Sequence, residues 1–404
     1  MKLVILIWAT LLGAHAEDSC VYKDIREYKK KLFSSNPVLD QVKLQKDATN
    51  SFVDKAKQRP NPALEFEYTR GDDFGLDTNN YDLKLLHVIE MGGKRSARME
   101  QALARAKLES NQYDLYGSRK GLENLLKYQR GAQLKFLDKA MVGAIETFRS
   151  IIKKLGSRKR LNPEEKVSLS TLKLALNDYT ARLNDFKNEQ DVLAGEVAFM
   201  GECKKLKFNY TPIKYPNIGV LELSEKQGMA AIEENKVEVA RKLLKQEKSL
   251  AYPDLMVGPI VGYETKGADE VVSAGIGITF NAPFLNTNYG GKLQASKNLL
   301  AQQKIAKNNI SLLKRKLNNQ LKVYHQSLKT YQAMPSLSKI AKFHNEAEQL
   351  FRRGVVSIPM IIESHRQYVD YMDSRFETEN DILNALMEIY IITGKKKLIE
   401  KLFN

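Results

Sequence analysis

The 404-residue sequence is poor in residues that interrupt helices and in residues that bind metals. It contains 11 Pro, 23 Gly, 2 Cys and 5 His. The low Pro and Gly content favours long helices. Cys20 and Cys203 give no zinc pattern, and the histidines are scattered, with none in a spacing typical of metal ligands. The sequence therefore predicts neither a metal site nor a cofactor.

Enzyme signatures are also missing. Neither Gly-x-Ser-x-Gly nor the phosphate-binding pattern Gly-x-x-x-x-Gly-Lys-Ser/Thr occurs. His365 lies on the apolar seam of a predicted helix, which favours a packing role over a ligand role. We expect a protein that is not an enzyme and that takes any energy it needs from a partner.

Long apolar runs are absent, so no helix is predicted to span a membrane. Residues 1–16 have the features of a secretory signal, because Lys2 gives a basic start, an apolar run follows, and Ala14-His15-Ala16 forms a small-x-small cleavage site. In an oxidising compartment Cys20 and Cys203 either form one disulfide or remain thiols. The sequence leaves both states open.

The net charge of +16, from 64 basic and 48 acidic residues, raises the question of a nucleic-acid partner. The two signs are interspersed along predicted helices, and an exported chain rarely meets nucleic acid. We interpret the charges as solvated helix faces and predict no nucleic-acid partner.

A duplication organises the chain. The sequence Gly92–Lys94 recurs as Gly290–Lys292, and Gly156 and Gly354 share the same offset of 198 positions (290 − 92 and 354 − 156). Each half is predicted as a helix, a strand pair, this Gly-Gly-Lys sequence, a long helix, a tight turn and another long helix. The predicted division is a signal peptide (1–16), a first repeat (17–202), a connector (203–220), a second repeat (221–394) and a basic tail (395–404). The first repeat has predicted strands 63–70 and 81–90 and a helical hairpin 94–201. The second repeat has predicted strands 255–264 and 271–281 and a helical hairpin 292–394.

Two periodicities support these elements. In 64–69, apolar and polar residues alternate, as in a strand with one apolar and one polar face. From Leu134 to Leu155, apolar residues recur at steps of three and four, the spacing of a coiled coil. Asn36-Pro37 and Asn162-Pro163 are predicted helix starts, and Pro335 should kink the second long helix.

Four strands of about ten residues cannot close a sheet alone and would leave two bare edges. The long helices also need neighbours, because their apolar seams cover only part of each surface. Three chains would supply twelve strands for one barrel. Both strand pairs have the length and alternation of transmembrane strands.

The chain resembles the TolC family of outer-membrane efflux factors, nearest the heavy-metal branch of CzcC and CusC. The resemblance covers about 36–394, and its specificity comes from the order and duplication of short motifs. These are Pro60-Asn61-Pro62-Ala63-Leu64-Glu65-Phe66-Glu67, Ile89-Glu90-Met91-Gly92-Gly93-Lys94-Arg95, Tyr252-Pro253-Asp254-Leu255, Pro283-Phe284-Leu285-Asn286 before Gly290, and Phe351-Arg352-Arg353-Gly354 with Ile362-Glu363.

This resemblance implies a mainly α fold with a β-barrel part. Three subunits would form a 12-stranded barrel in the outer membrane of a Gram-negative-type cell and an α-helical barrel in the periplasm. The homotrimer would passively conduct metal ions or drugs. Its implied partners are a periplasmic adaptor, an inner-membrane efflux pump and outer-membrane lipid.

The resemblance also places candidate functional residues at the two helix–helix turns. Adaptor docking would use the tips Lys154, Gly156, Ser157, Arg158, Arg353, Gly354 and Val355. Of the two acidic gate positions of the family, Glu363 keeps the acid and Met360 departs from it. The competing interpretation is that Glu363 is an ordinary exposed glutamate on a helix and that the basic side chains of the first turn are merely solvated.

The alternative function is an exported, soluble coiled-coil interaction protein of the periplasm. It would explain the helix seams but not the amphipathic strand pairs. Recovery from the soluble periplasm without detergent would favour this alternative.

Overall fold

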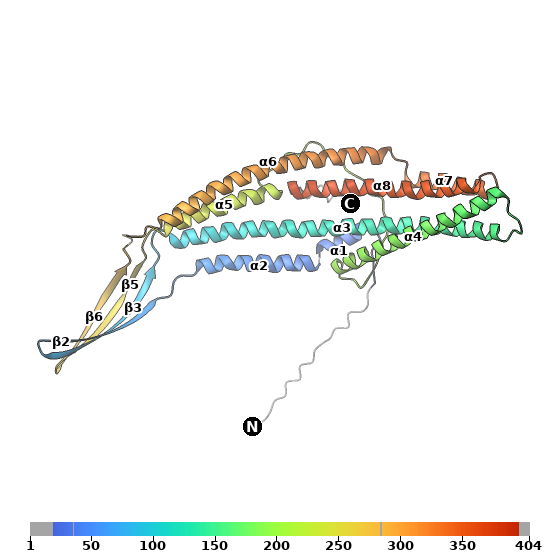
Figure 1. The fold of residues 1–404 in the computed structure, drawn as a ribbon. Helices are drawn as coiled ribbons and strands as arrows, with labels where there is room; N and C mark the ends of the chain where they lie inside the picture. The colour runs from blue at the N-terminus through green and yellow to red at the C-terminus, as the bar shows by residue number, and fades with distance from the viewer. Residues whose placement is uncertain (1–18, 35, 283–284, 396–404) are drawn as a thin grey trace, which may run out of the picture.

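The structure is a computed structural model that describes residues 19–34, 36–282 and 285–395. The predicted signal peptide and all of the predicted tail except Lys395 lie outside the described residues. Figure 1 shows an elongated molecule with a strand sheet at one end and long helices running away from it. Among the described residues, no helix combines the length and the apolar character needed to cross a membrane.

The elements follow one another in an order that repeats. In the described residues they are β1 (Ser19–Val21), α1 (Ile25–Ser34), α2 (Pro37–Lys57), β2 (Ala63–Asp73), β3 (Leu76–Ile89), α3 (Lys94–Gly156), α4 (Pro163–Met200), β4 (Lys205–Lys207), α5 (Gly228–Ser249), β5 (Leu255–Lys266), β6 (Asp269–Phe280), α6 (Tyr289–Ala333), α7 (Leu337–Arg352) and α8 (Ile358–Thr393). A helix, a strand hairpin and a long helical hairpin thus occur twice.

The two strand hairpins lie side by side in one antiparallel sheet with the order β2-β3-β5-β6. The pairing of β3 with β5 joins the two halves of the chain. The outermost strands β2 and β6 each pair with one neighbour only, so both edges of the sheet are open within the chain.

Helix starts follow the expected capping chemistry. The side chain of Asn36 accepts hydrogen bonds from the backbone N–H groups of Val38 and Leu39, both at 2.9 Å. Asn162 and Glu165 form a reciprocal capping box at the start of α4. Both predicted starts are confirmed. With 63 residues, α3 is about 95 Å long at 1.5 Å per residue.

The turn from sheet to helix differs between the two Gly-Gly-Lys copies. Gly92 and Gly93 both have positive φ, and a Cβ on Gly92 would lie 2.4 Å from the Tyr252 ring. Lys94 pairs with Asp254 of the other half at 2.7 Å. In the second copy the glycines lie inside α6, and Asn288 takes the left-handed conformation instead.

Two predicted boundaries are wrong. The loop expected over 71–80 is strand, because β2 and β3 pair up to Asp73 and Leu76 around a tight turn. Asp72 Oδ1 accepts the Gly75 N–H at 2.8 Å there, so strand pairing outweighs the low strand propensity of Asp and Asn. The helix expected from 221 begins at Gly228, whose positive φ ends the irregular connector.

The second long helix is broken rather than kinked. It stops at Ala333, and α7 starts after Ser336, whose hydroxyl caps the Lys339 N–H. Pro335 cannot continue the helical hydrogen bonds. Arg375 of α8 donates to the carbonyl oxygens of Tyr331 and Met334, each at 3.1 Å, and so satisfies the frayed end. Residues 25–34, ahead of the predicted helix start at Asn36-Pro37, form a helix of their own, α1.

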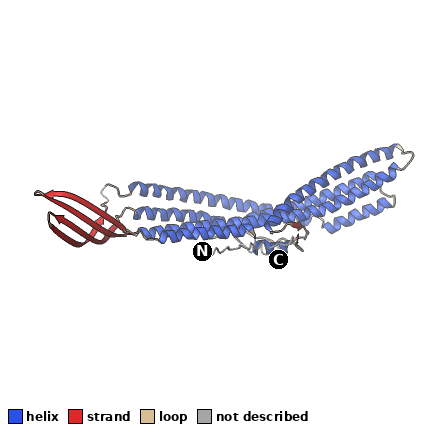
Figure 2. Cartoon of the chain, turned by 90° about the horizontal axis from the view of Figure 1, so that it is seen from below, coloured by secondary structure: helices blue, strands red, loops and turns tan. Residues whose placement is uncertain are grey.

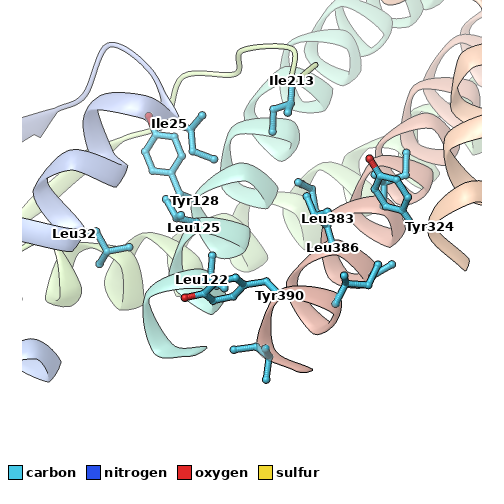
Figure 3. Packing of buried hydrophobic residues seen from close by; sticks show 14 of the residues in the cluster. Ile25, Leu32, Leu122, Leu125, Tyr128, Ile213, Tyr324, Leu383, Leu386 and Tyr390 are labelled. Carbon is cyan, nitrogen blue, oxygen red and sulfur yellow. The ribbon is translucent and has the colours of Figure 1, made fainter. Parts of the chain in front are cut away.

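The core runs along the helices. At mid-length, residues of α1, α3, α4, α6, α8 and the connector form the largest cluster (Figure 3). Within it the rings of Tyr28 and Tyr128 stack at 4.9 Å. Every member of the predicted seam from Leu134 to Leu155 is buried, which confirms it. Seen from below, the helical body changes direction near its middle (Figure 2).

Candidate functional site

One face of the sheet is apolar across all four strands and exposed. Strand register puts directly paired residues on the same face, as for Phe66 with Leu83, Leu83 with Val261, and Pro259 with Ile276. Phe66 is 68% exposed and Ile276 is 79% exposed. The large exposed side chains of this face are Leu64, Phe66, Tyr68, Tyr81, Leu83, Leu85, Val261, Tyr263, Val272, Ile276, Ile278 and Phe280.

The opposite face of the sheet is polar or small over much of its width. Glu67, Asp82, Gly262 and Ser273 lie in one row across the four strands. Lys84 pairs with Glu67 on this face at 2.8 Å. Charged groups gathered on one face need water there, whereas the other face excludes it.

A row of tyrosines crosses the apolar face near the hairpin turns. The rings of Tyr68 and Tyr81 are 5.0 Å apart, and those of Tyr81 and Tyr263 are 6.1 Å apart. From Tyr263 to Leu255, at the helix end of β5, the strand advances about 26 Å at about 3.3 Å per residue. The apolar face therefore has a border of tyrosines at one end and a length of about 26 Å along the strand from there to the helix end.

The two helix–helix turns lie together at the end of the molecule opposite the sheet (Figure 1). Lys154, Gly156, Ser157 and Arg158 are exposed in the first turn. Arg353, Gly354 and Val355 are exposed in the second. Below the turns, Phe148, Leu172, Phe351 and Ile361 belong to one apolar cluster that joins α3, α4, α7 and α8.

Glu363 lies two turns into α8 and is already paired. Arg366 of the same helix donates to its carboxylate at 2.5 Å, and Gln367 donates at 2.8 Å. The hydrogen bond from Arg366, with a smaller contribution from Gln367, lowers the pKa of Glu363. Met360, one turn earlier, is exposed and brings no second acid to this position.

Cys20 and Cys203 form a disulfide with a Cα–Cα distance of 5.7 Å. It joins the start of the described chain to the connector after α4, beside the parallel pairing of β1 and β4. The sequence left this bond and two thiols as alternatives.

A buried carboxylate, missed as a site from the sequence, organises the connector. Glu379 of α8 is fully buried and accepts hydrogen bonds from Gln133 at 2.8 Å, Tyr210 at 3.2 Å and Tyr215 at 2.9 Å. Burial raises its pKa, although the hydrogen bonds act in the opposite direction. A Glu on an apolar helix seam was the available signal.

We predict that Glu379→Ala lowers the free energy of unfolding by about 1–3 kcal/mol, because three hydrogen-bond donors, one of them fully buried, lose their acceptor. Glu379→Gln should cost less, since it keeps an acceptor. The raised pKa means that ionisation of Glu379 opposes folding. The stability that protonated Glu379 contributes is complete at pH values below its pKa in the unfolded chain. This stability is lost as the pH rises through its pKa in the folded protein.

The measurement is thermal unfolding in detergent from acidic to neutral pH. Stability of the wild type should fall with rising pH relative to Glu379→Gln. Parallel pH profiles for the two proteins would contradict the assigned ionisation.

Two histidines expected to be scattered lie in contact, which corrects that expectation. The ring centres of His344 on α7 and His365 on α8 are 4.5 Å apart. Glu348 Oε1 lies 3.9 Å from His344 Nε2 and 3.4 Å from His365 Nε2. His365 is buried, and its ring meets Phe148 edge-on at 5.2 Å, as expected for a residue on the apolar seam of its helix.

No protein-family model matches the sequence, and no curated protein matches it. Solved structures do share its fold. The Campylobacter jejuni CmeC outer membrane channel aligns with a TM-score of 0.68 at 11% identity, over 92% of this chain and 86% of that one. The open state of the Neisseria gonorrhoeae MtrE outer membrane channel gives 0.67 at 12% identity, over 94% and 90%.

A structure of CusC, described as forming a transmembrane channel, aligns with a TM-score of 0.64 at 12% identity, over 92% of each chain. Its score does not exceed that of CmeC, so likeness of fold does not separate the heavy-metal branch from the others. The predicted architecture, mainly α with a β part built from a repeated unit, is confirmed at the level of the subunit. The chain has the fold of the TolC family of outer-membrane channels, the family that its motifs resemble.

Proposed function

We propose that the protein is the exit duct of a tripartite efflux pump in the outer membrane of a Gram-negative-type cell, with a large periplasmic part. The observation that carries this proposal is the exposed apolar face of the sheet opposite a polar face. At a strand tilt of about 40°, its length of about 26 Å along the strand gives a band about 20 Å tall, comparable to the apolar band of about 25 Å in membrane barrels. Tyrosines at its border suit the membrane interface.

Three copies would remove the open edges of the sheet. β6 of one subunit would pair with β2 of the next, and twelve strands would close with the apolar face towards lipid and the polar face towards the lumen. Such a homotrimer leaves no edge of the four-stranded sheet exposed to water or lipid.

The helices also carry apolar side chains that stay exposed among the described residues. Several are seven residues apart, which is the coiled-coil repeat. These exposed pairs are Val167 and Leu174, Val192 and Phe199, Leu293 and Leu300, Ile305 and Leu312, and Phe343 and Leu350. We assign them to contacts with neighbouring copies in an α-helical barrel.

Conduction would be passive, because the sequence has no phosphate-binding loop for ATP. A periplasmic adaptor and an inner-membrane pump would then supply the energy and deliver metal ions or drugs. The exposed turns at 154–158 and 353–355 are the proposed docking tips. Reversing the charge at Lys154 and Arg353 should reduce crosslinking to a co-purified adaptor. Undiminished crosslinking would show that these side chains are solvated surface charges with no role in docking.

The decisive experiment measures subunit number and conductance together. Native mass in detergent should correspond to three copies, and the same sample should form ion-conducting channels in planar bilayers. A compact, folded monomer recovered from the soluble periplasm would overturn the duct and favour a coiled-coil interaction protein.

The same recordings test Glu363 as the periplasmic gate. Three Glu363–Arg366 pairs would hold the narrow end, and Glu363→Ala should raise the leak conductance of the closed state. Glu346→Ala, an exposed acid on α7, is the control. An unchanged leak in Glu363→Ala would remove Glu363 from the gate.

A further inference from the structure

Three potential metal ligands converge beneath the second tip. His344 and Glu348 are one helical turn apart on α7, and His365 faces them from α8. One ligand atom from each of the three lies within 4.8 Å of the others. The group is enclosed, because His365 is 1% exposed and the side chain of His344 is 12% exposed.

Three of the four imidazole nitrogens in this group form no hydrogen bond to any residue that the structure describes. Neither ring nitrogen of His365 makes a hydrogen bond, and Nδ1 of His344 makes none. The 3.4 Å approach of His365 Nε2 to Glu348 does not have hydrogen-bond geometry. Unpaired buried polar atoms are costly and point to a missing partner. The Nε2 atoms of both rings lie within 4 Å of one carboxylate oxygen of Glu348, an arrangement that a shared cation would satisfy.

Both rings are poised to act as ligands. Burial lowers the pKa of His344, and it lowers that of His365 to about 4, with a further contribution from neighbouring His344. Burial thus disfavours the charged form of both rings, and the neutral imidazole is the form that binds metals.

We propose that His344, Glu348 and His365 bind one divalent first-row transition metal ion per subunit, of the Zn²⁺ type. Two imidazoles and one carboxylate suit such an ion better than Ca²⁺ or Mg²⁺, which prefer oxygen ligands. Ligands about 2.0–2.1 Å from a tetrahedral ion lie about 3.3 Å apart. The 3.4 Å distance already matches, and the 3.9 Å distance needs a small closure.

Surrounding side chains hold the three ligands in place. Thr147 of α3 donates to Glu348 Oε1 at 3.1 Å, and Arg352 donates to Oε2 at 3.1 Å. Tyr368 stacks on His344 at 4.3 Å. Such outer contacts orient ligands and contribute to metal affinity. A bound ion would fasten α7 to α8 next to the turn and, through Thr147, close to α3.

The test measures Zn²⁺ content and affinity on the full chain in detergent. After equilibration with Zn²⁺ and removal of loosely bound ion, the wild type should retain one Zn²⁺ per subunit. His344→Gln and Glu348→Gln should each weaken Zn²⁺ affinity at least tenfold. Glu346→Gln, two residues away on the exposed face of α7, is the matched control and should bind as the wild type does.

Two further readouts separate the site from surface binding. Co²⁺ should give the visible absorption of a tetrahedral complex, and Zn²⁺ should slow hydrogen exchange over 337–370 in the wild type but not in Glu348→Gln. Ca²⁺ and Mg²⁺ should do neither. Equal Zn²⁺ binding by the wild type and His344→Gln would overturn the site, and so would a wild type that retains no Zn²⁺. Neither result bears on channel formation, which the bilayer recordings measure separately.

Discussion

Ile276→Lys should largely remove the protein from the membrane, whereas Gly275→Lys, one residue earlier, should not. Ile276 lies on the apolar face midway between the tyrosine row and the helix end of the strands, and it is 79% exposed in the single chain. A Lys facing lipid at mid-depth costs about 2–4 kcal/mol in each subunit. A Cβ on Gly275 meets no atom within 4 Å and points to the polar face.

The measurement is the fraction of protein in outer-membrane trimers, followed by denaturant unfolding in lipid vesicles. The paired substitutions share strand, depth and added charge, and they differ only in the face. Equal assembly of the two variants would show that the apolar face does not meet lipid.

Phe148→Ala should lower the free energy of unfolding by about 3–5 kcal/mol, the usual cost of truncating a fully buried aromatic ring. Phe148 of α3 is fully buried and meets Tyr179 of α4 and His365 of α8 edge-on, both at 5.2 Å. Its ring therefore joins the first helical hairpin to the second beneath the tips, and its loss should also loosen the closed end.

Guanidinium unfolding in detergent and leak conductance in planar bilayers would measure the two effects. Leu44→Ala on α2 removes apolar volume from a side chain that is 70% exposed in the single chain, so it is the control for truncation as such. Comparable losses for the two variants would contradict a special role for the Phe148 contacts. Phe148→Leu should recover part of the stability by filling most of the volume.

Much of the fold could be predicted because its signals are local. The caps at Asn36 and Asn162 and the seam from Leu134 to Leu155 each depend on residues within one or a few helical turns. Errors arose where distant contacts decide. Pairing with β3 extends β2 through Asp72, and Arg375 stabilises a helix end some forty residues earlier in the chain.

The candidate sites were predictable to different degrees. Alternation in 64–69 indicated the apolar face directly, but the tyrosine row needed the register of three strands. His344 and Glu348 have the i, i+4 spacing of neighbours on one helix face, and this signal was overlooked. His365 could not be joined to them from sequence, because the intervening turn sets how α7 and α8 align.

The break at Pro335 makes the two helical hairpins mechanically unequal. The first hairpin has an uninterrupted α3 of 63 residues, whereas the outer arm of the second is a separate α7 of 16 residues, about 24 Å long. Because the helix is broken at Pro335, α7 can rotate about this break while α6 keeps its position. Helix α3 has no such break and would have to bend along its whole length. If the narrow end of the proposed trimer dilates, the displacement should therefore be uneven. The three copies of α7 should pivot, and the three copies of α3 between them should move little.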